Sequence, residues 1–247
     1  MTAGNPLTNK VALITGASGG IGQAIARRLA ASGASVALAY NAHAKPAQKL
    51  ADELVDSGAS ALAGAADLSR PEAPAELLAE IEPQLGAIDV LVPAAGLGRV
   101  QRFEDVSLED FDEMIAVNLR APFLLAQRTL PGMQARGFGR VMFISSVAGF
   151  TGGIVGPHYA ASKAGLHGLT HFLAARAAAD GVTVNAIAPA LITDTGMLPG
   201  DPDELRSRVP VGRLGQPDEV ADLALAILRN PYITSQVVSI DGGMYPH

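Results

Sequence analysis

Two residues that could exchange a proton, Tyr159 and Lys163, stand four positions apart in a segment rich in Ala and Leu. That composition indicates a helix, and at this spacing both side chains leave the same helix face. A phenol ordinarily has a pKa near ~10, and a neighbouring ammonium lowers that pKa by stabilising the phenolate. The pair is therefore a candidate acid or base at neutral pH, with an ordinary solvated helix face as the alternative.

A glycine-rich loop near the start of the chain is a second candidate site. It directly follows a β-branched apolar run and leads into a helical pattern. Glycine lets the backbone approach a pyrophosphate closely, and the N–H groups of a helix N-terminus attract an anion. No Gly-Lys-Ser/Thr follows, which excludes a P-loop, and a plain glycine turn is the alternative. The expected nucleotide contacts in this loop are Gly16, Ser18, Gly20, Ile21 and Gly22.

Apolar runs and helical patterns alternate along the chain with short links between them. Strands are predicted at residues 10–15, 34–40, 59–66, 88–92, 140–144, 182–187 and 236–240, and helices at 23–33, 45–57, 71–85, 107–136, 157–180 and 217–229. The helix over 107–136 is expected to kink or break at Pro122 and Pro131, with Ser107 and Asp110 forming its cap. Continuously apolar strands linked by helices predict an α/β fold, a Rossmann-type doubly wound parallel sheet with helices on both faces.

Nothing in the sequence divides the chain, because no linker, repeat or change of composition occurs within it. Residues 1–247 are therefore predicted to form a single domain for dinucleotide binding and catalysis. The segment 190–214 is rich in Pro, Gly and Asp and is expected to be an irregular substrate lid. Its Leu191, Ile192, Met197 and Leu198 favour a fairly apolar substrate, with packing against a neighbouring subunit as the alternative.

The composition argues against several other classes of protein. The formal charge of −6 and the lack of a Lys/Arg run favour no nucleic-acid partner. No signal peptide or spanning apolar stretch is present, so we expect a soluble cytoplasmic protein without a membrane partner. Without Cys, disulfides and thiolate ligands are excluded. His167 and His171 are spaced as a metal pair would be but lack an HExxH carboxylate, and no metal site is expected.

The end of the second predicted strand bears on the choice between NADP(H) and NAD(H). An acid there would bind the ribose 2′-hydroxyl and repel a 2′-phosphate, but the chain has Tyr40 and Asn41, with Lys45 close behind. Asn41 could bind either cofactor and Lys45 could pair with a phosphate, so NADP(H) is preferred and NAD(H) is possible. Ordinary loop residues are the alternative. Asp67 and Leu68, after the third strand, are candidate adenine contacts, with a helix N-terminal acid as the alternative for Asp67.

Jointly, these motifs resemble those of the single-domain short-chain dehydrogenase/reductases. The resemblance rests on TGASGGIG at 15–22, Asn118 in VNL, Ser146 in ISS, and Tyr159 with Lys163 in YAASK. The motifs stand in the family's order and extend over essentially the whole chain. The resemblance implies a Rossmann fold, NAD(P)-dependent oxidation of alcohols or reduction of carbonyls, and usually a homotetramer.

The resemblance also implies roles for individual residues. Tyr159 would be the acid in reduction or the base in oxidation, and Lys163 would lower its pKa and hold the nicotinamide ribose. Ser146 would orient the substrate oxygen, with Ser145 as its alternative, and Asn118 would support Lys163 through water. Two donors aimed at that oxygen suit a reaction in which negative charge develops there. Further cofactor contacts are expected from Ala95, Gly96, Pro189 and Ile192.

The chain departs from the family pattern in three places. Pro93 and Ala94 replace two Asn residues that brace the strand ends, and Ala190 replaces a Gly after the sixth strand. Because Ala is strained at φ > 0, the backbone beside the nicotinamide is expected to differ at Ala190. Either Thr193 or Thr195 would meet the nicotinamide carboxamide. The altered strand ends are also the argument for a rival function, a non-catalytic dinucleotide-binding sensor or scaffold.

Within the family, the chain resembles the 3-oxoacyl-carrier-protein reductases at 139–149, 159–166, 209–221 and 239–245. This likeness predicts a small carbonyl or alcohol substrate, such as a 3-oxoacyl thioester of acyl-carrier protein or CoA, or a similar apolar ketone. Sugar, polyol and steroid dehydrogenases share the motifs and are alternatives. An acidic carrier protein would need basic docking residues. The candidates are Arg99, Arg102, Arg128 and Arg136, with ordinary surface arginines as the alternative.

Overall fold

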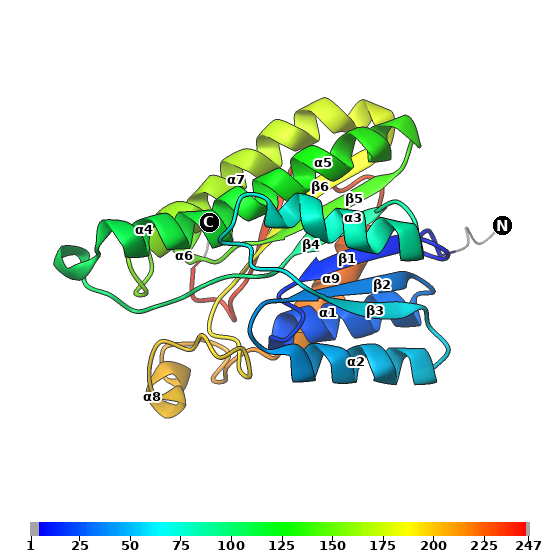
Figure 1. The fold of residues 1–247 in the computed structure, drawn as a ribbon. Helices are drawn as coiled ribbons and strands as arrows, with labels where there is room; N and C mark the ends of the chain where they lie inside the picture. Colours follow the sequence, from blue (N-terminus) through cyan, green and yellow to red (C-terminus); the bar gives the residue numbers. More distant parts are fainter. Residues whose placement is uncertain (1–4, 246–247) are drawn as a thin grey trace.

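Seven parallel strands form one sheet in the order β3-β2-β1-β4-β5-β6-β7 (Figure 1). The computed structural model describes residues 5–245, so the two ends of the expected 1–247 domain lie outside the described residues. The order reverses between β1 and β4, as in a doubly wound Rossmann-type sheet, and the predicted fold class is confirmed. The strands are β1 (Val11–Thr15), β2 (Ser35–Tyr40), β3 (Ala61–Ala65), β4 (Val90–Pro93), β5 (Gly139–Ile144), β6 (Val182–Pro189) and β7 (Val237–Ile240).

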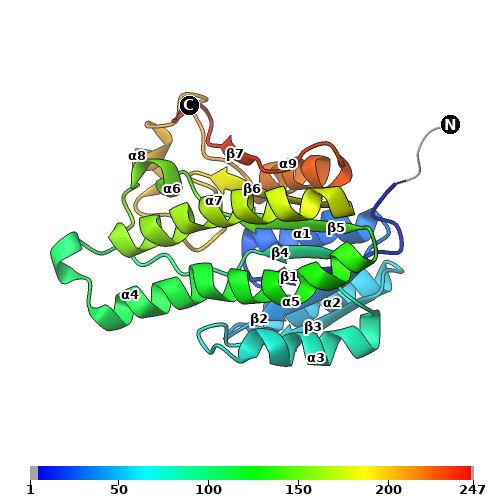
Figure 2. The ribbon, with the colours of Figure 1, turned by 90° about the horizontal axis from the view of Figure 1, so that it is seen from above.

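Helices cover both faces of the sheet, as Figures 1 and 2 show. One face carries α1 (Gly20–Ala31), α2 (Ala44–Asp56) and α9 (Pro217–Arg229), and the other carries α3 (Ala73–Leu85), α5 (Ala121–Ala135) and α7 (Pro157–Ala177). Side chains of β1 alternate between the two layers. Ala12 and Ile14 belong to the core beside α1, whereas Val11 and Leu13 belong to the core beside α3 and α5. This two-sided burial explains why the strand sequences are continuously apolar.

The chain between residues 107 and 136 differs from the expected helix kinked at its prolines. α4 (Leu108–Ile115) runs into a π-helical turn, Ala116–Arg120, before α5 begins. Pro122 lies in the first turn of α5, where a missing N–H costs little, and α5 continues through Pro131. The break therefore comes at the turn that holds the buried Asn118, and not at either proline. Ser107 caps α4 as predicted, because its Oγ accepts from Asp110 N at 3.0 Å.

Two short helices are absent from the sequence prediction. α6 (Ala148–Thr151) follows β5, and α8 (Pro202–Arg206) lies within the segment expected to be irregular. Asp201 caps α8, since its Oδ1 accepts from Asp203 N at 2.8 Å. α4 and α8 project beyond the carboxyl ends of the strands (Figure 1). No helix between residues 5 and 245 is long and apolar enough to span a membrane.

Candidate active site

A cavity of about 600 Å³ opens at the carboxyl edge of the sheet, beside the point where the strand order reverses. The loop after β1, the ends of β4, β5 and β6, the start of α7 and the lid segment border it. Parallel strands bring these distant segments together, because all their carboxyl ends lie at one edge. The predicted site residues that line the cavity are Gly16, Ser18, Gly20, Ile21, Gly22, Ala95, Gly96, Ser146, Tyr159, Lys163, Pro189 and Ile192.

The glycine-rich loop leaves no room for side chains. Gly16 has a φ of +67°, and a Cβ there would lie 2.6 Å from the Ala95 nitrogen. A Cβ on Gly22 would lie 2.5 Å from the Gly16 oxygen. α1 begins after Gly19 with no capping side chain, and the residues of its first turn border the cavity. These features fit the pyrophosphate of a dinucleotide, which needs close backbone approach and free N–H donors.

The two serines after β5 have different partners. Ser145 Oγ donates to the Lys163 carbonyl at 3.0 Å and lies 2.8 Å from His167 Nε2, so it ties β5 to α7. Ser146 Oγ accepts from Ala148 N at 3.2 Å and hydrogen-bonds the Tyr159 side chain. The geometry therefore pairs Ser146, and not Ser145, with Tyr159 in the cavity.

Tyr159 and Lys163 are both buried, and burial decides the direction of both pKa shifts. Burial raises the pKa of Tyr159, and the hydrogen bond from Ser146 opposes that rise only in part. Burial lowers the pKa of Lys163 to about 8. The Lys163 Nζ donates to the Ile144 carbonyl at 2.9 Å and lies 5.6 Å from the centroid of the Tyr159 ring. Desolvation disfavours the charged form of each group and sets the direction of both shifts, and the expectation that Lys163 lowers the Tyr159 pKa stays a prediction.

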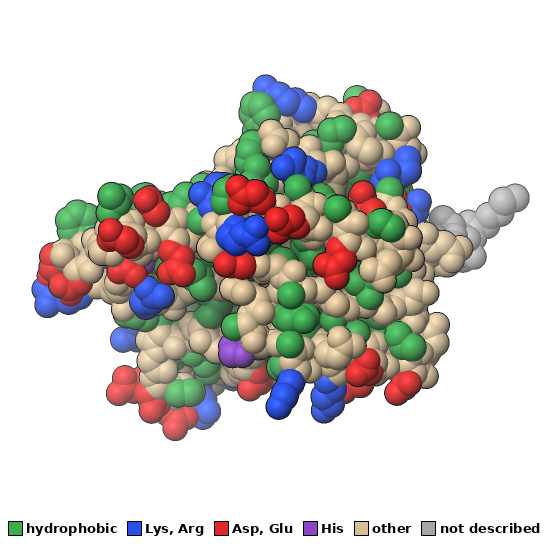
Figure 3. Space-filling model, viewed as in Figure 1, with side chains coloured by type: hydrophobic (Ala, Val, Ile, Leu, Met, Phe, Trp, Pro, Cys, Tyr) green, Lys and Arg blue, Asp and Glu red, His purple; other side chains and the backbone are tan. Residues whose placement is uncertain are grey.

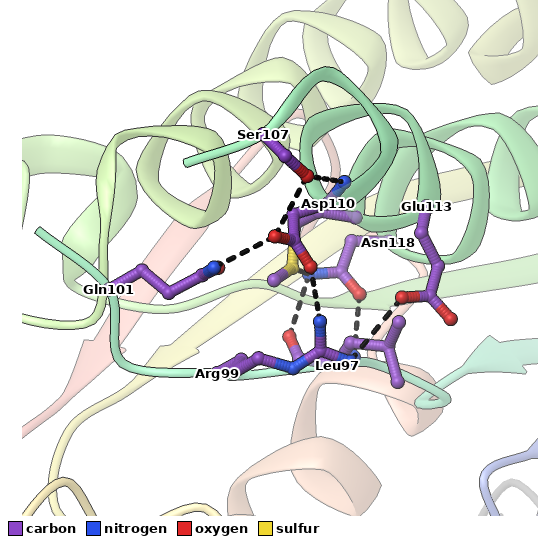
Figure 4. Close-up of polar contacts among 8 residues, drawn as sticks. Leu97, Arg99, Gln101, Ser107, Asp110, Glu113 and Asn118 are labelled. Carbon is purple, nitrogen blue, oxygen red and sulfur yellow. Dashed lines mark hydrogen bonds and ion pairs between the residues drawn. The ribbon is translucent and has the colours of Figure 1, made fainter. Parts of the chain in front are cut away.

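Asn118 lies behind the cavity and does not line it. Its Oδ1 accepts from Leu97 N at 2.8 Å, and its Nδ2 donates to the Leu97 carbonyl at 3.0 Å, as Figure 4 shows. The same Nδ2 donates to Ser162 Oγ at 3.2 Å. A Cβ on Gly96 would lie 3.4 Å from Asn118 Oδ1 and 3.5 Å from Lys163 Nζ, so the two side chains flank Gly96 together. Asn118 thus fixes the chain after β4 beside Lys163.

Three of the four arginines considered as carrier-docking residues form ion pairs. Arg99 pairs with Asp110 and, at 3.4 Å, with Glu113, which fastens the chain after β4 to α4 (Figure 4). Hydrogen bonds from Gln101 and Ser107 hold the pKa of Asp110 below its usual range. The other two ion pairs are Arg102 with Glu104, and Arg136 with Asp89 at 3.2 Å. The pairing favours the alternative, ordinary surface arginines.

The departures from the family pattern have local compensations. Ala95 N donates to Thr15 Oγ1 at 3.1 Å, so β1 braces the end of β4 without the expected Asn side chains. Ala190 is not among the residues with positive φ in the described chain, and its N donates to the Ile240 carbonyl at 3.1 Å. Ala190 therefore avoids the strain that a positive φ would impose on it, and the expected difference of the backbone from the family pattern stays a prediction. Leu191 and Asp194, with φ of +50° and +55°, hold the left-handed positions instead.

Four predicted cofactor contacts, Tyr40, Asn41, Asp67 and Leu68, do not line the cavity. Asp67 accepts hydrogen bonds from Ser69 N at 3.1 Å and Ser69 Oγ at 2.7 Å, and these bonds lower its pKa. Because α3 begins only at Ala73, the alternative of a helix N-terminal acid is wrong for Asp67, and its contact with the adenine stays a prediction. Leu68 is buried in the core.

Of the two threonines that are candidates for contact with the nicotinamide, only one lines the cavity. Thr195 lines the cavity, and its Oγ1 donates to the Ile192 carbonyl at 3.1 Å. Thr193 Oγ1 donates to Gln216 Oε1 at 2.9 Å, outside the cavity.

Several lining residues were not predicted as site residues, namely His43, Asp194, Arg208, Met244 and Tyr245. Among them, His43 lies two residues beyond Asn41, a predicted cofactor contact, and that proximity could have identified it. Arg208 and the C-terminal pair reach the cavity through the fold of the lid and β7, which local patterns do not specify. Met197, predicted only as an apolar lid residue, packs against the cluster that Tyr159 forms with Met114 and Ala148.

The family model described as "short chain dehydrogenase" matches residues 10–205. The 3-oxoacyl-[acyl-carrier-protein] reductase of Aquifex aeolicus is 37% identical, covering 97% of this chain and 98% of its own length. The acetoacetyl-CoA reductase of Allochromatium vinosum is also 37% identical, over 96% and 99% of the two chains. A crystal structure of a blue fluorescent protein from a metagenomic library, in complex with NADPH, superimposes with a TM-score of 0.91 at 35% identity, over 97% and 99% of the chains. The chain belongs to the short-chain dehydrogenase/reductase family.

Proposed function

We propose that this chain transfers a hydride between NADP(H) and a carbonyl or secondary alcohol, with a 3-oxoacyl thioester or a similar apolar ketone as substrate. One observation carries the proposal: Ser146 and Tyr159 meet in the cavity that also contains the glycine-rich loop and the uncapped start of α1. The cavity thus combines two hydroxyl donors with a backbone segment that can bind the pyrophosphate of a dinucleotide. This combination suits hydride transfer to a carbonyl.

The side chains act on the substrate oxygen. NADPH, when bound, supplies the hydride to the carbonyl carbon. Tyr159 is protonated at neutral pH, because burial raises its pKa, and it gives its proton to the oxygen as negative charge develops there. Ser146 donates a hydrogen bond to the same oxygen and orients the carbonyl. Lys163, in its charged form, offsets the negative charge left on Tyr159, and Asn118 keeps the adjoining backbone in place.

The end of β2 supports NADP(H) over NAD(H). No acid stands at this strand end, Asn41 is exposed, and His43 borders the cavity with Lys45 two residues on. A 2′-phosphate therefore meets no repelling carboxylate in this segment. A comparison of kcat/KM with the two cofactors tests this preference, and an NADH advantage would contradict it.

The lid supports an apolar substrate. Leu191, Met197, Leu198 and Leu205 line its part of the cavity, which disfavours the sugar and polyol alternatives. The argument for a non-catalytic sensor weakens, because Thr15 braces the altered end of β4. The relatives named for 3-oxoacyl and acetoacetyl thioesters support a thioester substrate. We also place the reaction in the cytoplasm, and recovery of the chain in a membrane fraction would contradict this.

The test is NADPH consumption with a panel of 3-oxoacyl thioesters and diketones, using the wild type and Tyr159→Phe. We expect the variant to bind NADPH as the wild type does and to lose roughly 10²–10⁴-fold in kcat, because the proton donor is gone. The unchanged cofactor affinity is the control for folding. Wild-type turnover in Tyr159→Phe would exclude the mechanism, and NADPH binding without turnover of any substrate would favour the sensor.

We propose a homotetramer as the assembly. Large apolar side chains stand exposed on the layer of α4, α5 and α7, where Figure 3 shows apolar side chains among charges of both signs. They include Leu108, Phe123 and Phe172. Exposed apolar groups in one layer are typical of a surface that a further copy covers.

A further inference from the structure

The lid end of the cavity has an apolar base. Leu205, Val209 and Leu214 are buried together, and Leu198 and Met244 pack against them. Leu198, Leu205 and Met244 also border the cavity. An acyl chain or the stem of a thioester would contact these side chains without losing hydrogen bonds. This part of the cavity therefore suits the uncharged portion of a ketone substrate.

Arg208 stands at this apolar end. It lines the cavity and is exposed, and its side chain has no hydrogen bond or ion pair within residues 5–245. The other two arginines of the same segment are paired: Arg206 with Asp203 at 3.1 Å, and Arg213 with Glu219 at 2.6 Å. An unpaired guanidinium beside an apolar surface is a ready partner for an oxyanion, which it can bind with two N–H donors at once.

The remaining charges of the cavity lie elsewhere. Lys163 is buried and donates to the Ile144 carbonyl, and His43 belongs to the segment after β2. Asp194 lies against Gly20 of the glycine-rich loop. The pyrophosphate of a dinucleotide has its own site at the start of α1. The Arg208 guanidinium thus adds positive charge at the lid, apart from the groups that serve the cofactor.

We propose that Arg208 recognises an oxyanion that the substrate carries away from its reactive carbonyl. This inference rests on the proposed function and adds the substrate class: ketones whose apolar portion ends in a phosphate or a carboxylate. The phosphate would belong to the phosphopantetheine arm of a thioester, and the carboxylate to a keto acid. The contact between Arg208 and the oxyanion lowers KM. It leaves kcat unchanged, because it lies away from the reacting atoms.

The experiment compares Arg208→Gln with Arg206→Gln, a neighbouring lid arginine that does not border the cavity. Each is assayed with two pairs of substrates, and in each pair one member is anionic and the other neutral. The first pair is the 3-oxobutanoyl thioester of 4′-phosphopantetheine against that of pantetheine, which lacks only the phosphate. The second is 3-oxoadipate against its diethyl ester, which tests the carboxylate.

We expect Arg208→Gln to raise KM about ten-fold for the anionic member of one pair, as for loss of one charge-assisted hydrogen bond, with kcat unchanged. KM for the neutral members, the Kd for NADPH and all parameters of Arg206→Gln should stay within about two-fold of the wild type. Equal losses for anionic and neutral substrates, or a matching loss of NADPH affinity, would overturn the inference. If the inference fails but the wild type still turns over the neutral ketones, the proposed function is retained. If the wild type turns over none of the substrates, the inference and the proposed function are both excluded.

Discussion

Lys163 is a positive charge that the fold buries at an energetic cost. Only 4% of the residue is exposed, and within residues 5–245 the one hydrogen bond of its ammonium is to the neutral Ile144 carbonyl. Its pKa of about 8, against an ordinary 10.5, corresponds to about 3 kcal/mol at 1.36 kcal/mol per pKa unit. Below pH 8 the folded state holds the buried charge. Between pH 8 and 10.5 the unfolded chain keeps a proton that the folded chain has released, so rising pH stabilises the fold.

Lys163→Met should therefore be more stable than the wild type at pH 7, by up to about 3 kcal/mol, while losing activity. The advantage should shrink as the pH rises from 8 to 10.5, because the wild type sheds its buried charge over that range. Chemical denaturation followed by circular dichroism at several pH values measures this difference in the free energy of unfolding.

The control is Lys49→Met, at a lysine whose side chain is 79% exposed. Replacement there should change stability little at any pH. A stability difference for Lys163→Met that does not vary with pH would show that the buried charge is not its cause.

At this scale the sequence predicts residue types but not their electrostatics. The Tyr159–Lys163 spacing and the family motif place both side chains in one cavity with Ser146, as the structure has them. The direction of the Tyr159 pKa shift in this chain does not follow from the sequence, because it depends on burial beside Met114, Ala148 and Met197, which come from other segments. Burial is a property of the assembled chain.

Among the elements, the glycine-rich loop and the lid are in contact. A Cβ on Gly20 would overlap the Asp194 carbonyl oxygen and lie 3.1 Å from the Pro217 ring. Gly19, one residue earlier, has open space by comparison: its nearest atom would be the Gly16 oxygen at 3.5 Å. The start of α1 and the lid therefore share one position that only glycine fits.

Gly20→Ala should displace the lid or the start of α1 and weaken NADPH binding by about ten-fold or more, since backbone atoms cannot move aside cheaply. Gly19→Ala is the matched control and should stay within about three-fold of the wild type, because its φ of −89° and its surroundings accept a methyl group. Fluorescence titration with NADPH measures both. Equal affinities of the two variants would contradict the role given to this contact.

Regular elements follow from local sequence more fully than irregular ones. All seven strands were predictable, because each is a continuous apolar run between turn residues. The π-helical turn was not, because Asn118 gains its partners Leu97 and Ser162 only when β4 and α7 are in place. α8 was not predicted either, because a helix of five residues gives too short a pattern to be identified.

At the scale of the whole molecule, the exposed apolar side chains on the layer of α4, α5 and α7 allow the proposed homotetramer to be tested by substitution. Phe172→Lys should lower the molar mass in solution from that of a tetramer, because a positive charge would be buried at the contact beside Arg176, which cannot neutralise it. Val55→Lys on α2, which lies across the sheet, is the control and should leave the mass unchanged. Light scattering coupled to gel filtration measures both, and a monomeric wild type would exclude the tetramer.

Leu191 is a position at which the cavity could be enlarged by substitution with little loss of stability. It borders the cavity in a left-handed backbone conformation, which costs a side-chain-bearing residue about 1–2 kcal/mol and glycine almost nothing. Most substitutions that enlarge a binding site sacrifice stability, because they remove packed atoms. Here the loss of packing and the relief of backbone strain would offset each other. Position 191 is thus a place where evolution, or an engineer, could admit bulkier ketones without first stabilising the rest of the protein.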